Sequence, residues 1–150
     1  MIEQQIKSTL GRELNVTGML VQKALDAELR KVSDLSSQQV IFMMVLKCDQ
    51  EMSTEDMCRQ FGVLAEEAEV FLEPLRKSAL IIQDENLRLT SKGEEALAKL
   101  WFIVERVERS ILAEISECEV DVLKKQLHQI QENCIQIMNG RSPSTTPLTA

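Results

Sequence analysis

The chain has 150 residues, enough for one ordinary domain with a hydrophobic core. Apolar residues make up 44% and charged residues 27%, as in soluble globular proteins, and the scarcity of glycine (5) and proline (3) favours a mostly helical fold. The formal net charge of −7 argues against a protein that simply adheres to a polyanion, so DNA binding would require a local basic patch.

The beginning of the chain is polar and amphipathic, without the apolar stretch of a signal peptide. The longest apolar run, Val40 to Leu46, is too short to span a membrane and suits a buried helix. We therefore expect a cytoplasmic protein with no membrane partner.

The four cysteines are Cys48, Cys58, Cys118 and Cys134, and none forms a CxxC pair or a zinc-binding spacing with the single His128. We expect free, buried thiols and no cofactor; the alternative, a redox-sensing thiol, has no neighbouring basic run or CxxC to favour it. One histidine, no glycine-rich phosphate loop and no nucleophile motif also argue against an enzyme.

The first element is predicted to be a long amphipathic helix over roughly residues 2–32. Its apolar residues recur at spacings of three, four or seven and form one stripe: Ile6, Leu10, Leu14, Val21, Leu25, Leu29 and Val32. Gly11 and Gly18 weaken this helix locally, so it either bends or starts late.

Three pairs of residues predict the starts of later helices. Ser36 with Gln39 indicates a capping box that opens a helix to about Lys47, and residues 48–52 are then a turn. Ser53 with Asp56 opens a short helix that stops at Gly62, and Ser91 with Glu94 makes a third capping box.

Between these signals, a helix is expected from about Leu64 to Ser78, with Pro74 distorting its last turn. Its inward residues are predicted to be Ala65, Ala68, Leu72 and either Leu75 or Phe71. Two short strands are expected around the turn 84–86.

The last two helices carry long apolar stripes. The first includes Leu97, Leu100, Val104, Val107, Ile111 and Ile115, and the second, after "SECE", follows a heptad spacing through Val120, Leu123, Leu127, Ile130, Cys134 and Ile137. These stripes favour dimerisation through the outer helices, with Leu10, Leu14 and Ile111 as candidate dimer residues. The alternative is a bundle of the outer helices within one chain.

The predicted fold is therefore mostly α, with a winged helix-turn-helix core and a short β-hairpin wing flanked by long terminal dimerisation helices. The expected divisions are an N-terminal dimerisation helix (1–34), the winged helix-turn-helix (35–90), C-terminal dimerisation helices (91–138) and a disordered tail (139–150). The tail has turn formers and no apolar period.

Four segments of this arrangement resemble motifs of the MarR family of bacterial transcriptional regulators. They are "LSSQQVIFMMVL", "STEDMCRQFGV", "VFLEPLRKSALI" and "LRLTSKGEEAL", and "LTSKG" after a hairpin is the most characteristic of them. The resemblance implies a dimer built from the first and last helices and a winged domain that docks DNA. It also implies a small-molecule effector pocket between these regions, for which Trp101, Phe102 and Met19 are candidate lining residues.

The chain departs from the family pattern where DNA would be read. The family wing carries a longer loop with an Asp-x-Arg-Arg-like element, whereas here "QDEN" separates the strands and Arg88 is the one basic residue nearby. Ala79 stands at the position of a family glycine. The positions that match the groove-facing residues of the recognition helix are Glu66, Glu69, Val70 and Glu73.

Between Ser53 and Thr90, eight acidic residues oppose four basic ones, where specific DNA binders are positive. One glutamate that accepts from cytosine is ordinary, but four on one helix are unusual, and a solvated helix face is the alternative. The candidate DNA-binding residues are Ser53, Thr54, Glu66, Glu69, Val70, Arg76, Lys77 and Arg88.

Two functions follow from these observations. The first is a MarR-like dimeric transcriptional regulator that binds DNA through the winged helix and responds to a ligand. The second is a winged-helix dimer that has lost DNA binding and acts as an antagonist or adaptor, its acidic face meeting a protein partner with a basic surface.

Overall fold

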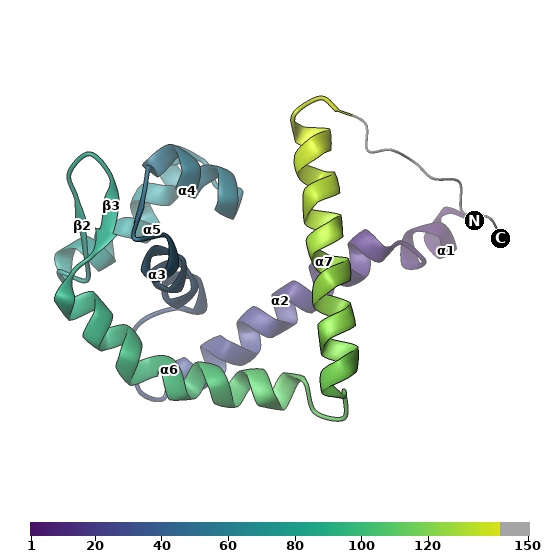
Figure 1. Ribbon diagram of the computed structural model, residues 1–150, viewed down its shortest axis with the longest axis horizontal. Coiled ribbons are helices and arrows are strands. Elements are labelled where there is room, and N and C mark those ends of the chain that lie inside the picture. The colour runs from purple at the N-terminus through teal and green to yellow at the C-terminus, as the bar shows by residue number, and fades with distance from the viewer. Residues whose placement is uncertain (142–150) are drawn as a thin grey trace. The chain divides into compact units, whose positions relative to one another are not determined.

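The computed structural model describes residues 1–141, which form seven helices and three short strands (Figure 1). The elements are α1 (Ile2–Lys7), α2 (Leu10–Leu29), α3 (Ser37–Asp49), β1 (Glu51–Met52), α4 (Thr54–Phe61), α5 (Ala65–Lys77), β2 (Ile81–Gln83), β3 (Leu87–Leu89), α6 (Ser91–Ile111) and α7 (Glu117–Met138). They confirm the predicted mostly helical fold with a winged helix-turn-helix and a short hairpin. The chain divides into two compact units, Met1–Ile111 and the part that begins at Leu112.

The N-terminal segment forms two helices, so the prediction of one helix over residues 2–32 is wrong. The hydroxyl of Ser8 donates to the Gln5 carbonyl at 2.8 Å, and that of Thr9 donates to the Ile6 carbonyl at 2.9 Å. Such side-chain bonds compete with helical backbone bonds, and the break falls here rather than at the glycines, which lie inside α2. Helix α2 ends at Leu29, before the exposed Val32.

The core of the first unit lies where α2, α3 and α6 pack together, with the sheet against α3 and α5 (Figure 1). Phe42 is fully buried at its centre and meets the rings of Phe61 and Phe71 edge-on, at centroid distances of 5.7 and 5.5 Å. The other fully buried hydrophobic side chains of the described residues are Leu29, Val40, Met43, Leu46, Met57, Ala68, Leu72, Leu75, Leu87 and Ile103.

Two predicted caps are confirmed. The backbone N–H of Gln39 donates to Ser36 Oγ at 3.2 Å, and the backbone N–H of Ser36 donates to Gln39 Oε1 at 3.0 Å, which completes the capping box of α3. The Asp56 N–H donates to Ser53 Oγ at 3.0 Å and starts α4, which stops at Gly62 in the left-handed region (φ 63°).

The third predicted cap is wrong, because Thr90 and not Ser91 caps α6. Thr90 Oγ1 accepts from the Gly93 N–H at 3.0 Å and donates to the Ala79 carbonyl at 2.6 Å. A Cβ added to Gly93 would lie 2.1 Å from the carbonyl oxygen of Leu80. The "LTSKG" motif is therefore a joint: its threonine and glycine let the start of α6 press against the chain that leads into β2.

The three strands form an antiparallel sheet in the order β1-β3-β2. Residues Ile81, Ile82 and Gln83 face Leu89, Arg88 and Leu87, as the predicted hairpin requires. Strand β1 was predicted as part of a turn, and its pairing of Glu51 with Arg88 and Met52 with Leu87 is a correction. A two-residue strand has no alternation for a sequence pattern to reveal.

Helix α7 begins earlier than predicted, within "SECE". Ser116 N–H donates to Glu119 Oε2 at 2.8 Å and Glu119 N–H donates to Ser116 Oγ at 3.2 Å, a capping box. The bond donated by the Ser116 backbone N–H, followed by hydrogen bonding of the Ser116 hydroxyl to the carboxylate, lowers the pKa of the Glu119 carboxyl below its ordinary value. No side chain of α7 is buried within the described part of the chain.

The cysteines are free, but the prediction that they are buried is wrong: Cys48, Cys118 and Cys134 are exposed and Cys58 is half-buried. Among the described residues, no helix is both long enough and apolar enough to cross a membrane. The predicted disordered tail falls mostly on residues 142–150, which lie outside the described residues.

Candidate nucleic-acid interface

Helix α5 buries one face and exposes the other. Ala68, Leu72 and Leu75 are buried in the core, whereas Ala65 is exposed, contrary to prediction, and Phe71 is half-buried. The outward face carries all four predicted groove-facing residues, Glu66, Glu69, Val70 and Glu73, and Val70 is 78% exposed. The helix therefore offers any ligand three carboxylates around one apolar side chain.

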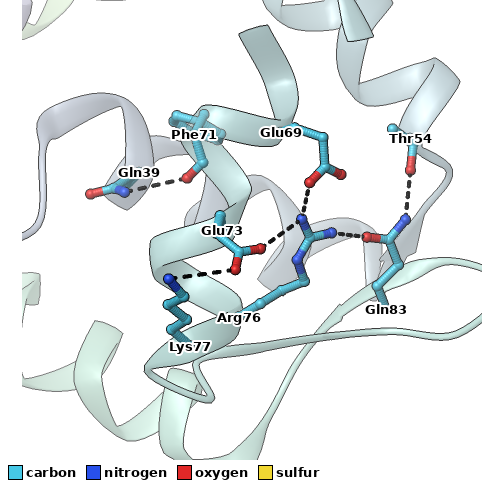
Figure 2. A network of polar contacts seen from close by, with 8 residues as sticks. All are labelled: Gln39, Thr54, Glu69, Phe71, Glu73, Arg76, Lys77 and Gln83. Carbon is cyan, nitrogen blue, oxygen red and sulfur yellow. Dashed lines mark hydrogen bonds and ion pairs between the residues drawn. The ribbon is translucent and has the colours of Figure 1, made fainter. Parts of the chain in front are cut away.

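A network around Arg76 joins this face to the wing (Figure 2). The Arg76 guanidinium donates to the carboxylates of Glu69 and Glu73, the latter at 3.2 Å, and to the side-chain carbonyl of Gln83 on β2. The hydrogen bond to Glu69, followed by the charges of both glutamates, raises the pKa of Arg76. The guanidinium therefore remains charged, and its donors are directed to partners in the same chain.

The network continues to the start of α4. Gln83 Nε2 donates to Thr54 Oγ1 at 3.1 Å, which links the wing to the start of α4, where Ser53 and Thr54 are candidate DNA-binding residues (Figure 2). Ser53 Oγ is the cap acceptor of Asp56, so that side chain already serves the helix itself. Sequence reasoning missed Gln83, because a single polar residue at the end of a strand carries no motif.

The remaining cations of residues 53–90, which we call the winged unit, also have acidic partners. Arg59 lies 3.3 Å from both Glu55 and Asp56, and Lys77 lies 3.8 Å from Glu73. Arg88, the one basic residue of the wing, pairs with Asp84. Each of the four basic side chains between Ser53 and Thr90 is thus in an ion pair.

The pairing of Arg88 also shapes the hairpin. The Asp84 carboxylate accepts from the backbone N–H of Asn86 at 3.3 Å and from the Arg88 guanidinium. These contacts, with the backbone bond first, lower the pKa of Asp84. The carboxylate at the wing tip is therefore ionised near neutral pH, where an approaching phosphate would meet it.

These pairs are exposed or half-buried, so each contributes little to stability and a phosphate can compete for its cation. Transfer of Arg76 to a phosphate would, however, leave Glu69 and Glu73 unpaired beside the same anion. The electrostatic cost of DNA binding is therefore higher here than the count of four cations suggests.

The predicted dimer residues lie on the outer helices. Leu10 and Ile111 are exposed and Leu14 is half-buried, on α2 and at the end of α6. Helices α2 and α6 do pack together within the first unit, and Glu28 on α2 pairs with Arg106 on α6 at 2.9 Å. Much of the exposed apolar surface is on α1 and α2: Ile2, Ile6, Leu10, Val16, Met19 and Leu20.

A cavity of about 680 Å³ opens between α3 and α6. Met44, Leu97 and Trp101 give it an apolar lining, and Lys47, paired with Glu94 at 2.9 Å, gives it a polar one. Of the three predicted pocket residues, only Trp101 lines this cavity, since Phe102 and Met19 are not among its lining residues.

No protein-family model and no curated protein sequence matches the chain. Solved structures do. A structure of MarR is 18% identical with a TM-score of 0.77, covering 88% of this chain and 95% of that one. A MarR family transcriptional regulator from Listeria monocytogenes in complex with a 26-mer DNA is 19% identical, with a TM-score of 0.72 and coverage of 92% and 99%.

A MarR family protein from Mycobacterium tuberculosis in complex with salicylic acid is also similar. It is 17% identical with a TM-score of 0.68, covering 82% of this chain and 98% of that one. The matches span nearly the whole of each of these proteins. The chain therefore has the winged-helix fold of the MarR family.

Proposed function

We propose that the chain is a MarR-like transcriptional regulator that works as a homodimer. The observation that carries the proposal is the winged unit itself, in which α5 lies beside a hairpin and exposes one whole face. One protein of similar structure is described with DNA and another with salicylic acid. These similarities support DNA and a small molecule as partners of this chain.

Dimerisation is supported by apolar surface that one chain leaves exposed. Helix α7 buries none of its side chains, although its apolar residues follow a heptad spacing. Exposed apolar side chains also follow α1 and the first half of α2. A second copy can cover such stripes symmetrically, because the same surface serves both partners.

DNA contact through the winged unit is the first candidate mode of action. Thr54 and the N-terminus of α4 would approach a phosphate, Lys77 and Arg88 would leave their acidic partners for the backbone, and Glu66 would accept from cytosine. Such a binder has few phosphate contacts, so its affinity falls only shallowly with salt.

The test uses fragments of the promoter region of its own gene in a gel-shift titration from low to physiological salt. Lys77→Ala is expected to weaken binding to all sequences and to reduce the salt slope by about 1. Lys124→Ala, which removes the same charge from α7, is the matched control. Absence of retardation at low salt, together with no retention on heparin, would remove the DNA mode.

Protein contact is the second candidate, and a specific observation favours it. The four cations between Ser53 and Thr90 are all paired with acids of the same segment, whose eight acidic groups outnumber them by four. This face suits a basic protein surface better than a polyanion. A regulator of this kind would act by occupying another protein rather than an operator.

An effector would occupy the cavity between α3 and α6. Its apolar lining with one ion pair at the edge suits a planar, largely apolar molecule with an acidic group. Trp101 is the single tryptophan of the chain, so its fluorescence reports on this cavity alone. Salicylate is expected to quench it saturably, and Ala98→Phe, which fills the cavity without adding a second tryptophan, should block that response; linear, unsaturable quenching would exclude this site for salicylate.

A further inference from the structure

A second cavity lies beside the exposed face of α5, between the starts of α3 and α5 and the helix α4. It has a volume of about 400 Å³, and we call it the α5 groove. Apolar and aromatic side chains supply most of its lining: Met57, Phe61, Val63, Val70 and Phe71, with Ser36, Gln38, Gln39 and Glu67 as the polar members. The groove borders the acidic face of α5 that both candidate modes of action use.

The buried core beneath the groove holds its aromatic lining in place. Phe61 and Phe71 both pack edge-on against the buried ring of Phe42. Gln39 Nε2 donates to the Phe71 carbonyl at 3.4 Å and so ties α3 to α5 across the groove (Figure 2). A pre-formed apolar site loses little conformational freedom on binding, which favours affinity.

The edge of the groove combines apolar and acidic side chains. Val70, which lines the groove, is 78% exposed on a helix that also offers carboxylates. Glu66 and Glu67 lie four and three positions before Val70, and residues at these spacings are neighbours on a helix surface.

We propose that the α5 groove docks a segment of a different protein, which inserts one large apolar side chain over Phe61 and Phe71 and flanks it with lysine or arginine. The apolar lining accounts for the inserted side chain and the glutamates for the flanking charges. The inference rests on the proposal that the winged unit is a regulatory module, but it does not require DNA binding.

Charge decides between the occupants of the groove. The winged unit of a second copy would bring no unpaired cation to the groove, because its cations are already paired, and its own carboxylates would be repelled by the glutamates there. A nucleic acid would bring phosphates to the same glutamates. A basic segment of another protein gains from both features, and its docking would cover Val70 and block access to α5.

Peptide selection tests the proposal even though the partner is unidentified. Random twelve-residue peptides displayed on phage are selected against the full-length protein, and enriched sequences are synthesised and titrated by fluorescence anisotropy. The expected peptides carry one Leu, Phe or Trp next to at least two basic residues. Their affinity is expected to fall about 10-fold in Val70→Ser and further in Glu66→Lys, and to weaken with salt.

Two matched variants control for general effects. Ile82→Ser removes an exposed apolar side chain from β2, outside the groove, and Glu105→Lys reverses an exposed charge on α6; both should bind the peptides as the wild type does. Recovery of no peptide, recovery of peptides without this pattern, or equal affinity for Val70→Ser would overturn the proposal. Loss of DNA binding in the gel-shift test leaves the peptide result unchanged, so failure of the two proposals is distinguishable.

Discussion

The winged core and helix α7 have similar apolar periodicity and opposite burial. The inward face of α5 places Ala68, Leu72 and Leu75 at near-zero exposure, because α3, α4 and the sheet cover it. Helix α7 repeats apolar residues as regularly, yet none is buried. Periodicity thus tells which face of a helix is apolar, whereas the supply of neighbouring elements decides whether one chain can cover it.

The strongest test of this difference is Leu127→Asp on α7. If a second copy covers the seam, the substitution places a charge in each half of an apolar interface, and we expect the dimer dissociation constant to rise about 100-fold or more. Light scattering at micromolar concentration should then report the mass of one chain.

Gln126→Asp introduces the same side chain one position away, outside the seam, and should leave the dimer intact. The prediction fails if the wild type is itself monomeric at micromolar concentration. It also fails if both variants dissociate alike, since the effect would then come from added charge and not from the seam.

The next effect is on the core of the first unit. Phe42→Ala removes a fully buried ring that two other rings contact, and we expect it to lower the free energy of unfolding by about 3–5 kcal/mol. Urea titration at one fixed protein concentration measures it. Phe102→Ala removes a ring that is 56% exposed and is expected to cost much less; equal losses would contradict the assignment of the core.

Gly93→Ala tests the joint between the wing and α6. The new methyl group would meet the Leu80 carbonyl, so we expect a loss of about 2–3 kcal/mol despite the better helix propensity of alanine. Ser91→Ala, two positions away, should change stability by less than about 0.5 kcal/mol, because Thr90 caps the helix. A larger loss of stability in Ser91→Ala would show that Ser91 caps α6, as the sequence pattern predicts.

Ala79→Gly probes a smaller strain in the same region. Ala79 has a φ of 57°, in the left-handed region that disfavours a side chain. Glycine relieves this strain but loses more entropy on folding, so a net gain of about 0.5–1 kcal/mol is expected. The midpoint of thermal unfolding measures the gain, with Ala98→Gly as a helical control that should lose stability; a loss at both positions would contradict the prediction.

Local signals in the sequence predicted the fold well. The caps at Ser36 and Ser53, the stop at Gly62 and the hairpin depend on residues a few positions apart, and each is found. The errors arose where contact with a segment distant in the sequence determines the local structure. Met52 enters the sheet because β3 pairs with it, and Thr90 becomes the cap of α6 because its hydroxyl also reaches Ala79.

The residues of the candidate site were predicted, but the contacts among them were not. The acidic face of α5 and the four cations of the winged unit are visible in the sequence, and so is their imbalance. The sequence does not indicate the contact of Arg76 on α5 with Gln83 on β2, or that of Gln83 with Thr54 on α4. These contacts follow only from the packing of the three elements. The α5 groove depends likewise on Phe61 and Phe71 meeting over Phe42.

The smallest predicted effect concerns the start of α7. The capping box lowers the pKa of Glu119 in the folded chain, so its stabilising contribution is present above the unfolded pKa and is lost as the pH falls through the folded pKa. A carboxyl NMR titration should therefore place the pKa of Glu119 below the ordinary glutamate value of about 4.3. Ser116→Ala removes the hydroxyl whose hydrogen bond to the carboxylate lowers that pKa, and should raise it part of the way back, because the backbone N–H of residue 116 still donates to the carboxylate. A pKa at or above the ordinary value in the wild type would mean that the box is open in solution, and the start of α7 would then depend on the second copy rather than on its own cap.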